Sequence, residues 1–175
     1  MFLTGCASAN PPELSRYGDA DTTLCQKGSG SAAIAACERV MSRPEPTSWP
    51  GPTGTALTSV TYMIRTDSAL ALGRHLLAAA READAAAAIE RAVGFAREGV
   101  RVGPSSPATW ATLGVAANRA GRFQESTDAF AKVLTLEPTY FTRYPTYQTA
   151  SRSFQRQVWE ASQQGRRVGA SSGGE

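Results

Sequence analysis

Few side chains in this 175-residue chain have the chemistry of a catalytic or metal-binding site. The only histidine, His75, lies in a segment rich in alanine and leucine. No C-x-x-C pair, H-x-x-x-H pair or Asp-rich loop occurs, and these are spacings by which proteins hold zinc or calcium. The GSGS run at 28–31 lacks the Lys-Ser/Thr ending of a phosphate-binding loop. We therefore expect no catalytic residue, metal, cofactor or small-molecule substrate, and we place His75 on a helix surface or in the core.

Two of the three cysteines are placed to form a disulfide. Cys25 and Cys37 flank the 28–31 run, which is typical of a turn between two short helices. Antiparallel helices joined by this turn would bring the thiols together, and a bridge would add about 3 kcal/mol by the chain-entropy estimate. The alternative is a pair of buried, reduced cysteines. We expect the bridge, which indicates an oxidising compartment and leaves Cys6 unpaired.

Cys6 ends the run Leu3-Thr4-Gly5-Cys6, which resembles the lipobox of bacterial lipoproteins. The resemblance implies cleavage before Cys6, acylation of this residue and, with Ala7 next, delivery to the outer membrane of a diderm bacterium. Several acyl chains would tether a soluble domain firmly, because each buried CH₂ is worth about 0.8 kcal/mol. The alternative is a free cysteine in a flexible leader, which would allow a cytoplasmic protein. No apolar stretch approaches the roughly 20 residues of a membrane-spanning helix.

The charge pattern argues against nucleic acid as a partner. The net charge is +3, and the sixteen arginines and two lysines are dispersed along the chain. Nucleic-acid binding usually needs a denser basic face.

The composition divides the chain into five segments. We expect a leader and tether at 1–12, a helical hairpin at 13–42, a Pro-rich linker at 43–55, a helical domain at 56–163 and a flexible tail at 164–175. From Leu57 onward, apolar residues recur at helical spacing and predict either one long helix or two pieces broken near residues 66–67. Asp67 and Asp84 are candidate N-caps for helices in this region.

The clearest pattern covers 107–138 and predicts an antiparallel helix pair. Ser106 is a candidate N-cap and Pro107 suits a first helical turn. The second helix is expected over 123–136, with three apolar residues facing inward: Phe130, Val133 and Leu134. This segment resembles a tetratricopeptide repeat (TPR). The residues that match it, and to which the resemblance assigns packing roles, are Trp110, Leu113, Gly114, Gly121, Phe123, Phe130 and Pro138.

The resemblance implies an all-α, TPR-like stack of antiparallel helix pairs. Two positions depart from the repeat pattern, with Ala117 where tyrosine is frequent and Ser126 where alanine is usual. Leu72-Gly73 lies forty-one residues before Leu113-Gly114 and predicts an earlier repeat with an elongated second helix. The 25–41 hairpin would be a third repeat, and about three pairs are the minimum for a stable stack.

The residues after Pro138 are rich in aromatic side chains. A final helix over 146–163 is expected to cap the stack, and the aromatic rings either seal that end or form a binding surface. We assign Tyr140, Tyr144 and Trp159 to a partner-binding surface. The first helices of TPR pairs line a groove, and the resemblance places four further partner-binding residues there, namely Thr109, Thr112, Asn118 and Arg119.

These resemblances imply a non-catalytic scaffold that binds protein partners. The architecture resembles that of outer-membrane lipoproteins that assist assembly of pilus or secretion machines, facing the periplasm or the cell surface. One alternative is a fixed structural subunit of a larger envelope complex. The other is a cytoplasmic adaptor without lipid.

Overall fold

The computed structural model describes residues 19–44 and 52–144, with the backbone alone at 52–57. These residues form helices and connecting turns without any strand, so the predicted all-α class is confirmed for this part of the chain. The helices are α1 (Ala20–Lys27), α2 (Gly30–Met41), α3 (Pro52–Ala78), α4 (Glu82–Val102), α5 (Pro107–Arg119), α6 (Phe123–Leu136) and α7 (Tyr140–Arg143). The leader with Cys6, Trp159, the final helix predicted at 146–163 and the tail lie outside the described residues.

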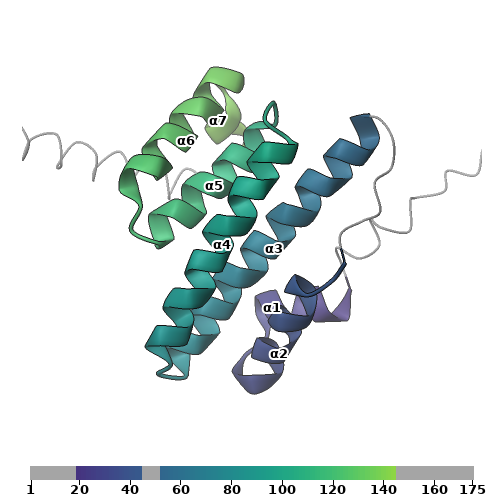
Figure 1. Ribbon diagram of the computed structural model, residues 1–175, viewed down its shortest axis with the longest axis vertical. Coiled ribbons are helices and arrows are strands. Elements are labelled where there is room, and N and C mark those ends of the chain that lie inside the picture. The colour runs from purple at the N-terminus through teal and green to yellow at the C-terminus, as the bar shows by residue number, and fades with distance from the viewer. Residues whose placement is uncertain (1–18, 45–51, 145–175) are drawn as a thin grey trace, which may run out of the picture.

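The helices pack as successive pairs. α1 lies against α2, α3 against α4, and α5 against α6. Each pair contacts the next one through α2 on α3 and α4 on α5, and α3 also touches both α1 and α5 (Figure 1). Each contact joins elements that are close along the chain, as in proteins built from helical repeats. None of the helices in 19–44 and 52–144 is both long and apolar enough to span a bilayer.

Small residues allow α3 and α4 to approach closely. The buried residues of α4 are small, and all but one of the following, each at most 2% exposed, are alanine: Ala85, Ala88, Ala92, Val93 and Ala96. At Gly73 of α3, a methyl group would lie 3.0 Å from the Ile89 side chain. The packing of α4 against α3 therefore depends on short side chains rather than on bulk.

The α5–α6 pair has an equivalent close approach. A methyl group on Gly114 would lie 2.6–2.8 Å from three ring atoms of Phe130. Ser126 is fully buried, and its hydroxyl donates to the Gly114 carbonyl at 2.7 Å. Trp110 packs against both core clusters of the protein, and its indole N–H donates to the Pro104 carbonyl at 2.8 Å. These contacts place Gly114, Phe130 and Trp110 in packing roles.

The two pairs share a constant offset of forty-one residues. Gly73 faces Ala85 and Ile89, and Gly114 faces Ser126 and Phe130. Each residue of the first set lies forty-one positions before its counterpart in the second.

The offset continues through the turn between the helices. Ala80 has φ 55° and Gly121 has φ 73°. Each turn closes with the same backbone bond, from Arg81 N to Leu76 O at 2.9 Å and from Arg122 N to Ala117 O at 2.8 Å. The earlier pair is thus a second copy of the same helix–turn–helix geometry. Its second helix is elongated as predicted, since α4 has 21 residues and α6 has 14, a difference of about two helical turns.

The structure decides in favour of one long helix from the two predicted alternatives, and it corrects the two predicted N-caps. α3 is continuous through Thr66 and Asp67, and the buried Thr66 hydroxyl donates to the Tyr62 carbonyl of the same helix at 2.7 Å. Asp67 is therefore not an N-cap. Asp84 lies in the first turn of α4, where it pairs with Arg81 at 2.7 Å instead of capping the helix.

The Pro-rich segment ends earlier than predicted. α3 begins at Pro52, inside the segment predicted as a linker to Thr55, because proline is tolerated in a first helical turn.

Three packing predictions in α6 and its flanks are wrong. Leu134 is 43% exposed instead of inward-facing. Its counterpart forty-one residues earlier, Val93, is 1% exposed because α5 covers it, whereas no described element covers Leu134 in this way. Phe123 is 51% exposed at the start of α6, and Pro138 is exposed after its end, so neither ring fills the core.

The turn residues allow a paired stability test. Ala80 adopts the left-handed backbone conformation, which costs a residue with a Cβ roughly 1 kcal/mol relative to glycine. We expect Ala80→Gly to raise the free energy of unfolding by about 0.5–1 kcal/mol, and Gly121→Ala to lower it by about 1 kcal/mol. Urea denaturation of both variants checks this. Effects of the same sign would contradict the equivalence of the two turns.

A second paired test uses two buried serines. The Ser68 hydroxyl is fully buried and has no hydrogen-bond partner among the described residues, whereas the Ser126 hydroxyl is bonded to Gly114. We expect Ser68→Ala to stabilise the fold by about 1 kcal/mol, because an unsatisfied buried donor is removed, and Ser126→Ala to cost about 1 kcal/mol. Thermal unfolding should shift upward for the first variant and downward for the second; a downward shift for both would refute the assignment.

Candidate partner-binding face

The structure divides the four α5 residues predicted to bind a partner into two groups. Thr109 and Thr112 are only 1% and 5% exposed, so their prediction as groove residues is wrong. The Thr109 hydroxyl bonds to the carbonyls of Gly103 and Ser106 at 2.9 and 2.8 Å, which ties α5 to the end of α4. Thr112 bonds to Ala108 of its own helix. Asn118 is half-buried and Arg119 is exposed, so these two remain accessible.

The accessible end of α5 lies beside an exposed stripe on α3. Along α3, Asp67, Arg74 and Leu77 are exposed and Leu70 is half-buried, at the spacing of one helix face. Leu77 occupies the position equivalent to Asn118, forty-one residues apart, and α3 and α5 are in contact and run in the same direction (Figure 1). We call this surface, formed by Asp67, Leu70, Arg74, Leu77, Asn118 and Arg119, the α3–α5 face.

The side of the protein formed by α2, α4 and α6 carries charges that are already paired. Arg91 of α4 pairs with Glu38 of α2 at 3.3 Å. Arg97 of α4 pairs with Glu125 of α6 at 2.7 Å, and Glu90 of α4 accepts from Arg122 at 2.6 Å. These bonds link three successive helix pairs.

The α3–α5 face differs in its electrostatics. Eight of the described arginines form ion pairs with carboxylates: Arg39, Arg43, Arg81, Arg91, Arg97, Arg101, Arg122 and Arg143. Arg74 and Arg119 form no ion pair with a described residue, and both are exposed. This face thus presents two guanidinium groups whose hydrogen-bonding capacity is open to a ligand.

Asp67 adds a titratable group to this face. Desolvation by the surrounding protein raises the pKa of its carboxyl from 3.8 to about 6, and the nearby charge of Arg74 partly opposes the rise. Water still reaches the side chain, so the energetic effect is smaller than for a fully enclosed group.

The raised pKa predicts a pH dependence. Between about pH 4 and pH 6 the native state binds more protons than the unfolded state, so the contribution of Asp67 to stability falls as the pH rises through that window. We expect Asp67→Asn to remove this contribution and to be more stable than the parent protein at pH 7. Denaturation midpoints measured from pH 4 to pH 7 check this, and parallel curves for the two proteins would contradict it.

The aromatic residues after α6 divide between core and surface. Tyr140 is 5% exposed and Phe141 9%, and both pack against Phe130 and Ala111. The prediction that Tyr140 binds a partner is therefore wrong, because the ring seals the end of the α5–α6 pair. Tyr144 is 44% exposed with its ring centroid 4.7 Å from that of Tyr140, so it remains accessible.

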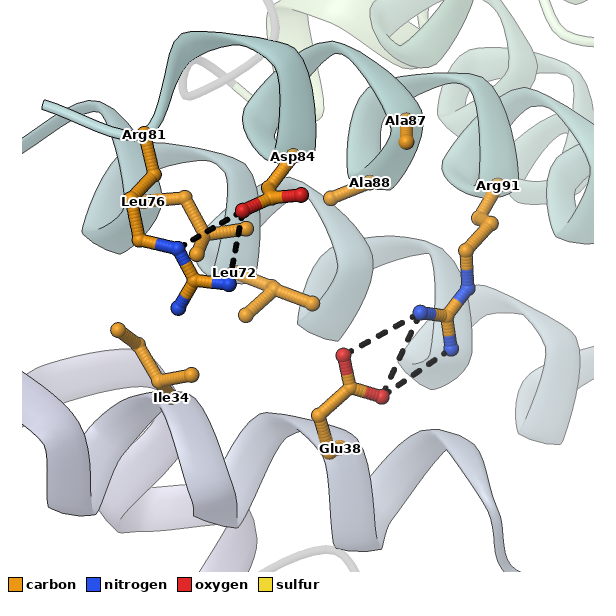
Figure 2. A pocket seen from close by; sticks show the side chains of 9 residues that line it. All are labelled: Ile34, Glu38, Leu72, Leu76, Arg81, Asp84, Ala87, Ala88 and Arg91. Atoms are coloured by element: carbon orange, nitrogen blue, oxygen red, sulfur yellow. Dashed lines mark hydrogen bonds and ion pairs between the residues drawn. The ribbon is translucent and has the colours of Figure 1, made fainter. Parts of the chain in front are cut away.

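A small pocket lies between α2 and α4. Its volume is about 190 Å³, with an apolar floor that includes Ile34, Leu72 and Leu76 (Figure 2). The polar side chains around it are already engaged in the Glu38–Arg91 and Arg81–Asp84 pairs. The pocket could take one apolar side chain, but no free polar group would orient a small molecule.

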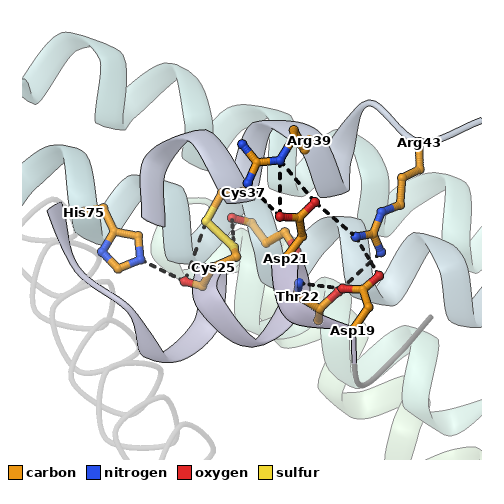
Figure 3. The surroundings of a disulfide bond; sticks show 9 residues. Asp19, Asp21, Thr22, Cys25, Cys37, Arg39, Arg43 and His75 are labelled. Atoms are coloured by element: carbon orange, nitrogen blue, oxygen red, sulfur yellow. Dashed lines mark hydrogen bonds and ion pairs between the residues drawn. A yellow bond between two sulfur atoms is a disulfide. The ribbon is translucent and has the colours of Figure 1, made fainter. Parts of the chain in front are cut away.

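The predicted disulfide is confirmed. The sulfur atoms of Cys25 and Cys37 are 2.14 Å apart, and both residues are fully buried. Asp21 at the start of α1 pairs with Arg39 near the end of α2 at 2.6 Å, so the two helices are antiparallel (Figure 3). The hydrogen bonds from Arg39 hold the pKa of Asp21 below its ordinary value.

His75 has a structural partner in this region. Its Nε2 lies 2.8 Å from the Cys25 carbonyl oxygen (Figure 3). Because a carbonyl can only accept, Nε2 carries the proton, and the half-buried ring connects α3 to α1. No group of three His, Cys, Asp or Glu side chains suited to a metal ion occurs in the part of the chain that the structure describes.

Comparisons with known proteins add no identification. No family model matches the chain, and neither the search of curated proteins nor the search of solved structures gives a significant match.

The sequence alone predicts only the α5 half of the face. Its pattern marks Asp67 as a candidate helix cap and does not single out Arg74 or Leu77. The signal that identifies them is the forty-one-residue offset, which makes Leu77 equivalent to Asn118.

Proposed function

We propose that this protein is a TPR-like, non-catalytic scaffold that binds a protein partner through its α3–α5 face. The observation that carries the proposal is the repeated helix pair: the close approaches at Gly73 and Gly114 and the turns at Ala80 and Gly121 recur at one offset. In a stack of such pairs, the first helices of successive pairs lie side by side and present one continuous surface. Here those helices are α3 and α5, and they carry exposed side chains that the fold does not use.

We further propose that the protein works in the cell envelope as an outer-membrane lipoprotein anchored through Cys6. The Cys25–Cys37 bridge supports an oxidising compartment. A role in assembling a pilus or secretion machine fits a small anchored scaffold. A fixed subunit of a larger envelope complex is the second candidate, favoured by the exposed apolar residues Leu134 and Tyr144 at the α6–α7 end, which a permanent neighbour would cover.

The compartment is tested by the intact mass of the protein purified from membranes of its own host, with thiols alkylated and no reductant added. An acyl mass on Cys6, with no alkylated thiol, is the expected result. Three alkylated cysteines and no lipid would refute the envelope proposal and indicate a cytoplasmic adaptor.

The mode of action is tested by the ratio of partner to scaffold in the same preparation. An assembly factor exchanges between client molecules, so the partner should copurify with it in substoichiometric amounts. A constant ratio across growth conditions would refute the assembly role in favour of the fixed subunit.

A further inference from the structure

We propose that the α3–α5 face recognises an acidic, extended segment of the partner protein, whose carboxylates bind Arg74 and Arg119 and whose apolar side chain packs on Leu77. This inference rests on the proposed function and specifies the chemistry of the partner.

The charge of the face is the first argument. Arg74 and Arg119 are exposed and form no ion pair with a described residue, in a protein where eight other arginines are paired with carboxylates. The guanidinium group binds a carboxylate through two parallel hydrogen bonds, and these charge-assisted bonds are the strong ones in proteins. Two such groups on one face favour an anionic ligand, and a carboxylate is the anion that a protein partner supplies without modification.

The spacing of the two arginines is the second argument. Neighbouring helix axes lie about 8–10 Å apart. Arg119 lies forty-five residues after Arg74, which is the repeat offset plus one helical turn, or about 6 Å along the axis. At this axial spacing the two positions would lie about 10–12 Å apart, which an extended chain spans in about three to four residues.

An exposed leucine adds the apolar part of the site. Leu77 is 53% exposed and follows Arg74 by three residues, so both lie on the same side of α3. An apolar side chain between two acidic residues of the partner would cover Leu77 and exclude water from both ion pairs, which strengthens them.

The same face argues against a membrane surface as the ligand. Anionic headgroups carry negative charge across the whole contact area, and this charge would meet Asp67, two helical turns from Arg74 on the same stripe. A peptide avoids the repulsion, because it can place a neutral or basic residue opposite Asp67.

The experiment is site-specific photocrosslinking in the native host with the full chain. A benzoylphenylalanine replaces Leu77, and mass spectrometry identifies the crosslinked segment. We expect two acidic residues about four positions apart in that segment. We also expect Arg74→Glu and Arg119→Glu each to lower the crosslink yield about tenfold, because a charge reversal replaces attraction by repulsion.

Lys132→Glu is the matched control, since Lys132 is an exposed cation on α6 without an ion-pair partner among the described residues. It should leave the yield unchanged, and circular dichroism should show that all three charge variants are folded. Lysines in place of the two acidic residues of the partner should restore the crosslink to the doubly reversed protein.

The outcomes separate the two proposals. A crosslink that is equally strong in the arginine variants and in Lys132→Glu, or a segment without acidic residues, would overturn the acidic-segment inference while leaving partner binding at this face intact. A lipid adduct in place of a peptide would overturn it in favour of a membrane ligand. The absence of any crosslink would refute partner binding at this face, and with it both proposals.

Discussion

Gly114→Ala is expected to lower the free energy of unfolding by about 2–3 kcal/mol, the upper part of the range for overpacked cores. The new methyl group would lie 2.6–2.8 Å from three atoms of the Phe130 ring, and Phe130 is only 4% exposed. The ring cannot simply rotate away, because Phe141 packs against it edge to face at 5.7 Å. Chemical denaturation of the variant and of the parent protein measures the loss.

Gly94→Ala is the control for this prediction. Gly94 lies within α4, and a methyl group there would meet no atom within 4 Å. The same substitution should therefore stabilise the protein by about 0.5–1 kcal/mol through helix propensity. Phe130→Leu in the Gly114→Ala background should recover part of the loss, because a smaller side chain relieves the overlap. Equal effects of the two glycine substitutions would show that Gly114 is not a contact point between the helices.

Removing the disulfide is the second change with a large expected effect. Cys25→Ser with Cys37→Ser should cost about 3 kcal/mol, because the unfolded chain gains the freedom that the bridge removes and two buried sulfur atoms are replaced by hydroxyl groups. The loss should appear as a denaturation midpoint that is lower for the double variant than for the oxidised parent protein, because the contacts of α1 with His75 and with Arg39 weaken when the bridge is absent.

Reductant provides the control for the disulfide prediction. It should lower the denaturation midpoint of the parent protein and leave that of the double variant unchanged. If the parent protein and the double variant have the same stability without reductant, the bridge does not stabilise the fold.

Several elements could be predicted because a local physical cause marks them. The α6 boundaries follow from the turn glycine before it and the proline after it, and the structure places the helix at Phe123–Leu136. The disulfide followed from a short turn between two helices. The elongated α4 followed from comparing two Leu-Gly pairs along the chain. Each of these predictions depends on residues close together in the chain, or on two segments with the same residue pattern.

The incorrect predictions concern residues whose burial or position in a helix is set by the residues packed around them in space. Thr109 and Thr112 have polar side chains typical of a surface, but their hydroxyl groups bond to nearby carbonyls, which permits their burial. Leu134 has the correct spacing for a core residue, yet burial depends on the element that follows it in space. Asp67 fits a helix cap by residue type, but it lies inside α3, which continues through this position. Such differences depend on tertiary contacts that no local pattern contains.

The proposed α3–α5 face could be predicted only in part for the same reason. The repeat resemblance identified Asn118 and Arg119 on α5, while α3 matched the repeat weakly. The structure supplies the missing half, because the equivalent turns at Ala80 and Gly121 set the register between the pairs. Once that register is known, Leu77 and Arg74 are found from their exposure and charge.

The most direct test of partner binding through the α3–α5 face is the copurification of the partner with two single variants from host membranes. Leu77→Asp places a charge on the α3–α5 face, and Ala86→Asp places the same charge on an exposed site of α4 outside it. We expect the partner to be lost with Leu77→Asp and retained with Ala86→Asp, while both proteins remain folded. Retention of the partner by both variants would show that the α3–α5 face is not the binding surface.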